Sequence, residues 1–315
     1  MSTELSQGED CKLLEAHNVV ICVATYRRNE QLRQLLESVA EQADPIPQVI
    51  VVDNNPEPQV QESVRQAYPT ATYLHQPEPG IASARNKALD ALPEDVAGVI
   101  FVDDDERVRP GWLTALLDCA NSSGADVVYG PVFAVLPENP PDWLTRWGLD
   151  GPGYIRRTDF ATGPWDRRPA TNNALVRAEW FTSRGLRFDE VFNFTGGSDT
   201  DLFQTMIDEG ATIWWCAEAE VEEDVPASRV TKTWLRKRQQ RVGYVRAMQQ
   251  AKRGRSRVSL FTEGAARIGV GLTRGPLRLV QREVLSYPDR GYLYQGLGFM
   301  SAALGGVSEE YSRKT

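Results

Sequence analysis

Three consecutive aspartates, Asp103 to Asp105, follow directly on a run of β-branched and aromatic residues, Val99 to Val102. A run of this length and composition is typical of a strand that is covered on both faces. In open α/β sheets the carboxyl ends of the strands line the ligand crevice, and carboxylate oxygens suit a hard divalent cation such as Mg²⁺ or Mn²⁺. An isolated acidic run is more often a solvated turn. The choice between a solvated turn and a cation site therefore depends on the motifs elsewhere in the chain.

The first half of the chain alternates strand-like and helix-like segments. Apolar runs of strand length end in polar turns, and the segments that follow have helical spacing, as in Leu32, Leu35, Leu36 and Val39. This βαβα order predicts an α/β fold with a mostly parallel, Rossmann-like central sheet flanked by helices. The expected strands are 18–24, 49–52, 71–75 and 99–102, and the expected helices are 30–40, 59–67 and 80–89.

The second half is less regular, and we expect one core domain with an appendage. The predicted division is a flexible N-terminus at 1–16, a core domain at 17–226 and a basic helical C-terminal extension at 227–315. Residues 150–168 are rich in Gly, Arg and aromatic side chains without a period, which favours a long loop over the crevice. Further expected elements are a helix at 110–120, a strand at 126–135 interrupted at Gly130 and Pro131, strands at 171–176, 212–216 and 219–222, a helix up to 209 that Ser198 or Asp199 would cap, and a basic helix at 229–251.

Charge is unevenly distributed along the chain. The net charge of −8 hides a basic segment, residues 225–315, with 18 Lys and Arg against 5 Asp and Glu, so residues 1–224 carry −21. A basic segment can face nucleic acid, an anionic membrane or an anionic substrate. The acidic remainder would repel a phosphate backbone, which argues against a nucleic-acid partner. Because the chain has only 2 histidines, acid–base chemistry is expected to rest on carboxylates.

The sequence also bears on location. No stretch approaches the ~20 apolar residues of a membrane span, the first ten residues are polar and acidic, unlike a signal peptide, and the 4 cysteines are far apart. The expected location is therefore the cytoplasm. Two options stay open for the basic helix at 229–251: peripheral contact with the cytoplasmic face of a membrane, or packing on the core domain with its basic face in water.

Polar residues at the ends of the first two expected strands are candidates for binding a nucleotide. Neither Gly-x-Gly-x-x-Gly after the first strand nor Gly-x-x-x-x-Gly-Lys-Ser/Thr is present, which excludes the usual phosphate loops of dinucleotide-binding and P-loop proteins. Side chains at strand ends can instead hydrogen-bond a base or ribose, and an aromatic ring can stack on the base. Arg85, at the opening of a helix, could bind a phosphate through two parallel bonds. The residues at the strand ends are Thr25, Tyr26, Arg27, Asp53 and Asn54.

An ordered series of motifs carries a resemblance to a known family. The series is ICVATYRR, VVDNN, GIASARNKAL, VIFVDDDE, TNNALVR and TGGSDTDL, within residues 19–243. In this order and spacing it resembles family 2 glycosyltransferases of the GT-A fold, and it is most similar to bacterial succinoglycan and exopolysaccharide-type members. The resemblance implies an inverting glycosyltransferase with a nucleotide-diphosphate-sugar donor, a UDP-sugar being favoured. It also implies a divalent Mn²⁺ or Mg²⁺ ion and a saccharide acceptor, with a lipid-linked acceptor as one option.

The resemblance assigns roles in donor and metal binding. Asp105 would be the principal metal ligand, Asp103 would lie near both the metal and the ribose, and Glu223 is a weaker third metal candidate. Because all three positions from Asp103 to Asp105 are Asp, the register of the motif stays open by one residue. The implied donor-binding residues are Thr25, Tyr26, Arg27, Asp53, Asn54, Arg85, Asp103 and Asp104.

The catalytic base is expected at Asp199. Inverting transfer needs one carboxylate to remove a proton from the acceptor hydroxyl as that hydroxyl attacks the anomeric carbon. Ser198 stands where relatives commonly have Glu, which leaves Asp201 as a competitor for the role. Trp214 and Trp215 could line the acceptor site, although buried strand aromatics are the commoner case.

Two other functions remain open from the sequence. A nucleotidyltransferase also combines an α/β sheet, an acidic pair and a metal, but it would ordinarily have a Gly-rich loop after the first strand, which TYRRNE lacks. A nucleotide-sugar-binding module without catalysis would keep the donor-binding residues. It would release no nucleoside diphosphate when given donor and acceptor.

Overall fold

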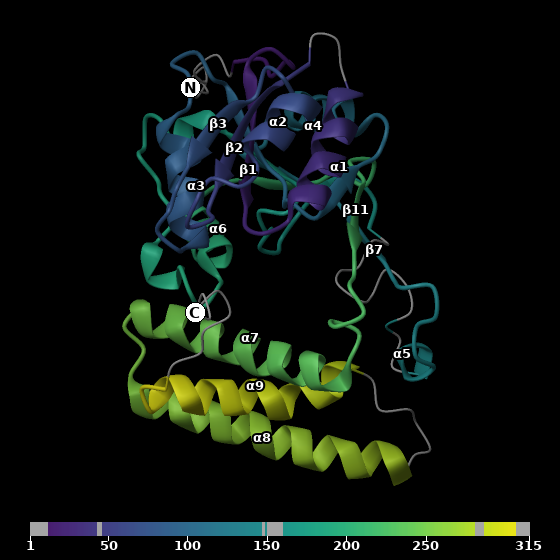
Figure 1. Ribbon diagram of the computed structural model, residues 1–315. Coiled ribbons are helices and arrows are strands. Elements are labelled where there is room, and N and C mark those ends of the chain that lie inside the picture. Colours follow the sequence, from purple (N-terminus) through teal and green to yellow (C-terminus); the bar gives the residue numbers. More distant parts are fainter. Residues whose placement is uncertain (1–11, 43–45, 147–148, 150–159, 281–286, 307–315) are drawn as a thin grey trace, which may run out of the picture.

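An eight-stranded sheet forms the centre of the protein in the computed structural model, which describes residues 12–42, 46–146, 149, 160–280 and 287–306 (Figure 1). The strand order is β3-β2-β1-β4-β9-β6-β10-β8. Strands β3, β2, β1 and β4 run parallel to one another, as do β6 and β10, whereas β9 is antiparallel to β4 and β6, and β8 is antiparallel to β10. The predicted mostly parallel sheet is confirmed. Its strands are β1 Val19–Thr25, β2 Gln48–Asp53, β3 Thr72–His75, β4 Gly98–Phe101, β6 Val127–Tyr129, β8 Gly163–Pro164, β9 Ala174–Arg177 and β10 Ile213–Trp215.

A second, three-stranded sheet flanks the first, in the order β5-β11-β7, from β5 Glu106–Val108, β7 Val132–Val135 and β11 Val221–Asp224. The expected strand at 126–135 divides at Gly130 and Pro131, and its halves join different sheets. A Cβ at Gly130 would lie 2.3 Å from the carbonyl oxygen of Ala219, so the chain can turn there only without a side chain. The small sheet places Glu106 directly opposite Glu223.

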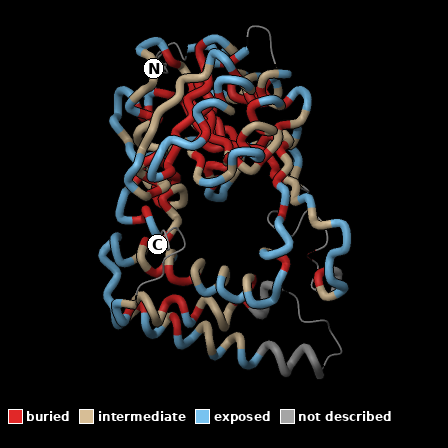
Figure 2. Tube along the Cα trace, viewed as in Figure 1, coloured by how far each residue is buried: buried red, intermediate tan, exposed pale blue. Residues whose placement is uncertain are grey.

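Helices cover both faces of the large sheet, as the alternation predicted. The helices α1 Asn29–Ala40, α2 Gln61–Ala67 and α4 Trp112–Ser123 pack on one face, and α3 Ile81–Asp90 and α6 Ser198–Asp208 pack on the other. Strand β1 contributes side chains to the apolar clusters on both faces of the sheet. Val19, Ile21 and Val23 point to the face covered by α1, α2 and α4, and Val20 and Cys22 point to the face covered by α3 and α6. Figure 2 shows the resulting concentration of buried residues in the sheet.

Several details differ from the expectations. The N-cap of α6 is Gly197, in the left-handed region at φ 92°, and not Ser198 or Asp199. The segment 150–168 was expected to be a loop; residues 150–159 lie outside the described part, and β8 adds a short strand at the sheet edge. Of the expected flexible N-terminus, residues 1–11 lie outside the described part, while Leu14 is buried and donates its N–H to Asn121 of α4. The remaining short elements are α5 Trp143–Arg146 and the 3-10 turns Ala178–Trp180 and Glu190–Phe192.

Three long helices follow the sheets: α7 Lys232–Lys252, α8 Arg257–Val280 and α9 Tyr287–Ala303. Helix α7 reaches across beneath the sheet region, α9 packs against α7 and α8, and α8 lies farthest away (Figure 1). Near its start, α7 inserts Leu235 into an apolar cluster with Leu144 and Val225. At its end, Lys252 forms an ion pair with Asp201 of α6. Of the two options for the basic helix, packing on the core domain is what the structure describes.

Glycines set the distance between α7 and α9. A Cβ added at Gly298 would lie 2.0 Å from the carbonyl oxygen of Gln240, and one at Gly243 would lie 2.1 Å from that of Gln295. One helix can approach the backbone of another this closely only at a residue without a side chain. In the part of the chain that the structure describes, no helix has both the length and the apolar content to span a membrane.

We predict opposite effects of two Gly→Ala substitutions in this bundle. Gly298→Ala should lower the free energy of unfolding by about 1–3 kcal/mol or more, because the new methyl group overlaps a backbone oxygen. Gly269→Ala, on the exposed side of α8 with no atom within 4 Å of the added Cβ, should raise it by roughly 0.5–1 kcal/mol by restricting the unfolded chain. Urea unfolding measures both; equal effects would contradict the close α7–α9 contact.

Candidate active site

A cavity of about 440 Å³ lies where β1 and β4 end, and it brings together most of the predicted site residues. Parallel strands deliver their carboxyl ends to one edge of a sheet, so the acidic run after β4 meets the turn after β1. Helix α7 and the start of α6 close the other side. The charged side chains in its wall are Arg28, Arg85, Asp103, Asp104, Asp105, Asp199, Glu223, Arg229, Arg238 and Arg241.

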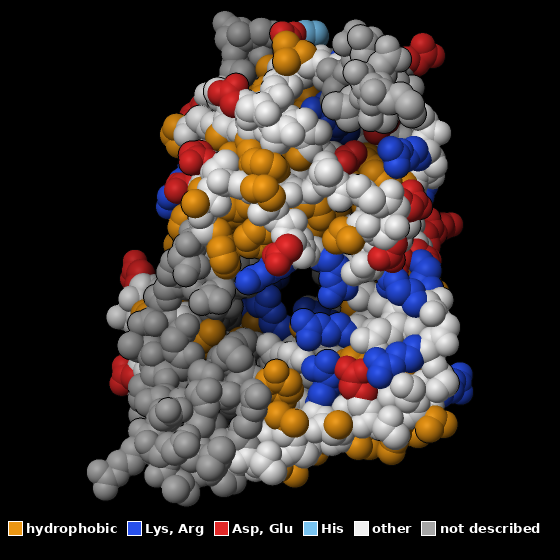
Figure 3. Space-filling model, turned by 180° about the vertical axis from the view of Figure 1, so that it is seen from behind, with side chains coloured by type: hydrophobic (Ala, Val, Ile, Leu, Met, Phe, Trp, Pro, Cys, Tyr) orange, Lys and Arg blue, Asp and Glu red, His pale blue; other side chains and the backbone are white. Residues whose placement is uncertain are grey.

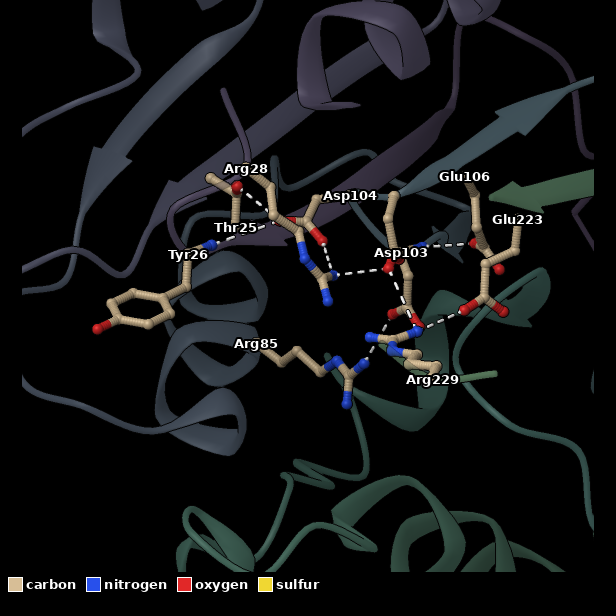
Figure 4. A network of polar contacts seen from close by, with 10 residues as sticks. Thr25, Tyr26, Arg28, Arg85, Asp103, Asp104, Glu106, Glu223 and Arg229 are labelled. Carbon is tan, nitrogen blue, oxygen red and sulfur yellow. Dashed lines mark hydrogen bonds and ion pairs between the residues drawn. The ribbon is translucent and has the colours of Figure 1, made fainter. Parts of the chain in front are cut away.

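Asp104 is the most deeply buried of the three aspartates and joins two loops (Figure 4). Its Oδ2 accepts a hydrogen bond of 2.7 Å from the hydroxyl of Thr25 and one of 3.4 Å from the N–H of Tyr26. Its Oδ1 accepts one of 2.6 Å from Nη1 of Arg28. These contacts fix the turn after β1 against the turn after β4.

Asp105 lies between two arginines that sequence reasoning did not assign to the site. Its Oδ2 is 3.0 Å from Nη1 of Arg28 and 3.7 Å from Nη1 of Arg229. Arg229 also forms an ion pair of 2.9 Å with Glu223 (Figure 4). Only their positions in the sequence could have placed them in the site. Arg28 belongs to the same turn as Tyr26, and Arg229 follows closely on the acids of β11.

Asp103 is the aspartate most open to the cavity. Its side chain is 41% exposed, against 6% for Asp104 and 12% for Asp105. It forms an ion pair of 3.1 Å with Arg85, which comes from the opening turns of α3. Asp104 is thus held by protein groups and Asp103 is the most exposed of the three, while the choice of the metal-binding aspartate stays a prediction.

Glu106 adds a buried acid beneath this cluster. Its Oε2 accepts the N–H of Asp103 at 2.7 Å, while its Oε1 is buried without a partner among the described residues. Burial raises the pKa of Glu106, and Asp103 and Glu223 raise it further. Burial likewise raises the pKa of Asp105 to about 7, despite the opposing charge of Arg28.

These hard oxygen donors fit a divalent cation in type and charge. The unpaired Oε1 of Glu106 and the raised pKa of Asp105 are the two observations that favour added positive charge here. Within the described residues, no group of three His, Cys, Asp or Glu side chains is already arranged to hold a metal. A bound cation would need oxygens from the substrate as well as from Asp103 and Asp105.

Asp53 and Asn54 lie at the same sheet edge but do not line the cavity. Asp53 is fully buried, and burial would raise the pKa of its carboxyl, but the hydrogen bonds that it accepts outweigh burial and lower it. Asn54 donates to the carbonyl oxygens of Gln76 and Glu78, both at 2.7 Å. Both side chains thus hold the loops after β2 and β3, and their donor-binding roles stay predictions. The groups that donate to Asp53 are the N–H groups of Asn55, Gln59 and Val60, the Asn55 amide and the Tyr73 hydroxyl.

Tyr26 and Arg27 also lie beside the cavity rather than in its wall. Arg27 adopts φ 58°, a left-handed conformation that is uncommon for a residue with a side chain. Its guanidinium lies 5.0 Å from the centre of the Tyr26 ring. Local strain of this kind is often found at ligand-binding turns.

Asp199 and Asp201 occupy different environments. Asp199 lines the first cavity and also a second one, of about 520 Å³, on its other side. Asp201 is buried, and its carboxylate lies 2.6 Å from Nζ of Lys252 and 3.6 Å from Nη1 of Arg253. Of the two competitors for the base, only Asp199 has access to the cavities, while Asp201 holds the end of α7.

The two asparagines of the TNN motif, Asn172 and Asn173, have different surroundings. Asn173, at φ 90° and fully buried, accepts from the indole N–H of Trp112 and donates to the carbonyl oxygens of Pro131 and Ala219. It joins α4 to the turns that lead into β7 and β11. Asn172 instead lines the first cavity, and its buried Oδ1 has no partner among the described residues. Sequence reasoning quoted the motif without assigning either role.

Comparison with known proteins gives the family. The family model described as glycosyl transferase family 2 matches residues 20–185, which is more than half of the chain. The chain belongs to this family. The matched region runs from β1 through β9 and contains the three aspartates, Arg28 and Arg85. The predicted family and GT-A fold are confirmed, and the nucleotidyltransferase alternative finds no support.

Curated relatives agree with this assignment. The succinoglycan biosynthesis protein ExoM of Rhizobium meliloti (strain 1021) is 38% identical over 238 residues, covering 73% of this chain and 74% of ExoM. The galactofuranosyltransferase GlfT1 of Mycolicibacterium smegmatis is 28% identical over 215 residues, covering 64% of this chain and 70% of GlfT1. The prediction of similarity to succinoglycan-type proteins is thus confirmed.

Solved structures show the same fold at low identity. A crystal structure of S. aureus TarS 1-349 matches with a TM-score of 0.53 and 15% identity, over 71% of this chain and 65% of that one. The same protein in complex with UDP-GlcNAc matches with a TM-score of 0.52 and 16% identity, over 66% and 59%. At this identity the likeness concerns the architecture of the glycosyltransferase domain and not its substrates.

Proposed function

We propose that this family 2 glycosyltransferase is an inverting, metal-dependent enzyme. It would transfer a sugar, of the hexosyl type, from a nucleotide-diphosphate donor to a saccharide acceptor in surface polysaccharide assembly. The observation that carries the proposal is the position of Asp199, whose side chain lines both cavities. A carboxylate between two cavities can remove a proton from a hydroxyl of the ligand in one cavity while that hydroxyl attacks the ligand in the other. ExoM, named for succinoglycan biosynthesis, supports the polysaccharide context.

The first cavity is assigned to the donor. Arg85 and Arg229 lie in its wall and can pair with diphosphate oxygens, while Thr25, Tyr26, Arg27, Asp53 and Asn54 surround the neighbouring strand ends. A UDP-sugar is the donor we propose, in keeping with the UDP-GlcNAc bound by the structural neighbour TarS. A divalent Mn²⁺ or Mg²⁺ ion, held by Asp105 and Asp103 with Glu223 nearby, would supply charge that neutralises the departing diphosphate.

In the proposed reaction Asp199 accepts the proton of an acceptor hydroxyl in the second cavity. The hydroxyl oxygen then forms a bond to the anomeric carbon while the bond to the diphosphate breaks. Attack from the face opposite the leaving group inverts that carbon. One carboxylate suffices, because the diphosphate leaves as an anion and needs positive charge rather than a proton.

We also propose the division of labour along the chain. Residues 17–226 would form the catalytic domain and 227–315 an extension that completes both cavities through α7 and faces the membrane through α8. The exposed positions of α8 from Val258 to Thr273 carry no charge, and they include Val258, Phe261 and Leu272. Such a face next to Arg255 and Arg257 suits peripheral contact with the cytoplasmic face of an anionic membrane, where a lipid-linked acceptor would be reached.

Donor binding should be measurable as thermal stabilisation. A panel of nucleotide sugars with and without Mn²⁺ should contain at least one that raises the unfolding temperature only with the metal, since a ligand at about 100 times its Kd stabilises by about 2.7 kcal/mol. Asp105→Asn should lose the metal-dependent part of the shift. Lys237→Gln, an exposed change on α7, should keep it. A complete panel without any shift would overturn the donor assignment.

The base assignment predicts a contrast between two aspartates. Asp199→Asn should reduce the transfer rate on the order of 10²–10⁴-fold while nucleotide binding stays unchanged. Asp201→Asn should mainly lower the free energy of unfolding, because it weakens the ion pair between the buried Asp201 carboxylate and the part-exposed Lys252. Rates come from nucleoside diphosphate release and stability from urea unfolding. The opposite pattern would move the base to Asp201, and a wild type that binds donor but never releases nucleoside diphosphate would indicate a binding module.

Membrane contact can be tested by flotation with vesicles. The wild type should float with vesicles that contain anionic lipid and less with neutral ones, and the triple change Val258→Ser, Phe261→Ser and Leu272→Ser should remain at the bottom of the gradient. Thermal unfolding of the variant controls for folding. If the variant floats as well as the wild type, α8 is not the contact surface.

A further inference from the structure

The second cavity differs in charge from the first. It lies between the sheets and α7, and among the described residues its wall contains five arginines and one carboxylate, that of Asp199. Three of the arginines come from one face of α7, where Arg238, Arg241 and Arg246 follow at helical spacing together with Val242 and Val245. Figure 3 shows Lys and Arg side chains gathered around a hollow in the molecule.

Several of these arginines lack a carboxylate partner. Among the described residues, no Asp or Glu forms an ion pair with Arg168, Arg238 or Arg246. Arg246 donates to the amide oxygen of Gln295 at 3.2 Å instead. Enclosure by the surrounding protein, and then the charges of Arg267 and Arg168, lower the pKa of Arg246, although part of its surface stays open to solvent. Glu263 offsets part of this effect on Arg246. Converging cations repel one another, and an anion between them removes that repulsion.

An aromatic wall stands in the same cavity. The rings of Trp165 and Trp215 stack with centroids 4.8 Å apart and an interplanar angle of 22°. Phe160 packs edge-on against Trp165 at 4.9 Å. The guanidinium of Arg167 lies 5.1 Å from the Phe160 centroid and 5.5 Å from that of Trp165. Trp215 is buried beneath Trp165, so the half-buried Trp165 and Phe160 are the rings on which the C–H face of a sugar can pack, and nearby polar groups then fix its orientation.

From these observations we infer that the second cavity binds an acceptor saccharide that itself carries a negative charge, either a phosphate ester or a uronic carboxylate. The inference rests on the proposed function, which assigns this cavity to the acceptor because Asp199 borders it. The aromatic wall holds the sugar ring, and the arginines hold the charged group through charge-assisted hydrogen bonds. A neutral saccharide would leave those cations unpaired and bind less tightly.

The test is a tryptophan-fluorescence titration in EDTA with three monosaccharide probes: glucose 1-phosphate, methyl glucuronide and methyl glucoside. At least one charged probe should bind about 10-fold or more tightly than neutral methyl glucoside. Arg246→Gln and Arg168→Gln, which line only this cavity, should each lose that preference. The tighter of the two charged probes tells whether the charge is a phosphate ester or a carboxylate.

Lys237→Gln is the matched control, because it removes the same charge from an exposed position of α7 that lines neither cavity. It should keep the preference for the charged probe. Equal binding of neutral and charged probes, a preference that survives in both arginine variants, or no saturable signal from either charged probe would overturn the inference. Circular dichroism shows whether the variants are folded, and Arg168, exposed outside any helix, is the change that folding tolerates best.

A parallel titration separates this inference from the proposed function. UDP with Mn²⁺ should bind wild type, Arg246→Gln and Arg168→Gln equally, because neither arginine lines the donor cavity. If UDP binds but charged and neutral probes do not differ, the acceptor inference fails and the proposed function stands. If the charged probes bind through Arg246 but no nucleotide binds, the anion site is real and the donor assignment fails.

Discussion

The buried carboxylate of Asp104 is the contact on which the arrangement of the site depends. It accepts hydrogen bonds from the hydroxyl of Thr25 and the guanidinium of Arg28, so it ties the turn after β1 to the turn after β4. An ionised group in this position is stable only while those donors compensate its burial. The same contact leaves Arg28 within 3.0 Å of Asp105 and leaves Asp103 turned toward the cavity. One buried acid thus orients its two neighbours.

The division of charge along the chain has a spatial meaning. Residues 1–224 are strongly acidic and residues 225–315 are basic, and the two meet where α7 crosses below the carboxyl edge of the sheet. Arg229 pairs with Glu223 at one end of this junction, and Lys252 pairs with Asp201 at the other. Between those ends the arginines of α7 face the cavities. These two ion pairs, together with the burial of Leu235 against Leu144 and Val225, hold α7 against the core, and its arginines face the space between.

Much of the fold was predictable because its signals are local. The apolar runs at β1, β2 and β4 and the spacing of Leu32, Leu35 and Leu36 in α1 carry the period of the element that they form. The meeting of the strand ends follows from parallel pairing alone. Strands near β7 and β11 were expected, but their pairing in a separate sheet with β5 was not, because it joins Glu106 to Glu223 across more than a hundred residues and the β5 stretch continues an acidic run.

The site was predictable only in part, for the same reason. The aspartates and Asp199 stand in recognisable motifs, whereas Arg28, Arg229 and Arg238 acquire a role only through their distance in space from those motifs. A sequence of basic residues in α7 is equally compatible with a solvated face. Asp53 illustrates the reverse case, since a side chain at the expected strand end is occupied by hydrogen bonds to its own loop.

The position of the proposed base depends on the extension as much as on the sheet. Asp199 stands in the first turn of α6, directly after Gly197. Gly197 accepts a hydrogen bond of 3.1 Å from Gln249 of α7, and a Cβ there would lie 2.2 Å from the side chain of Val245. Two residues beyond Asp199, Asp201 is paired with Lys252. Helix α7 therefore holds the α6 turn from both sides of Asp199, and the chain segment that lines the acceptor cavity also fixes the carboxylate that would act on the acceptor. In the proposed mechanism, acceptor binding and proton removal would both depend on one interface, between α6 and α7, rather than on two separate domains.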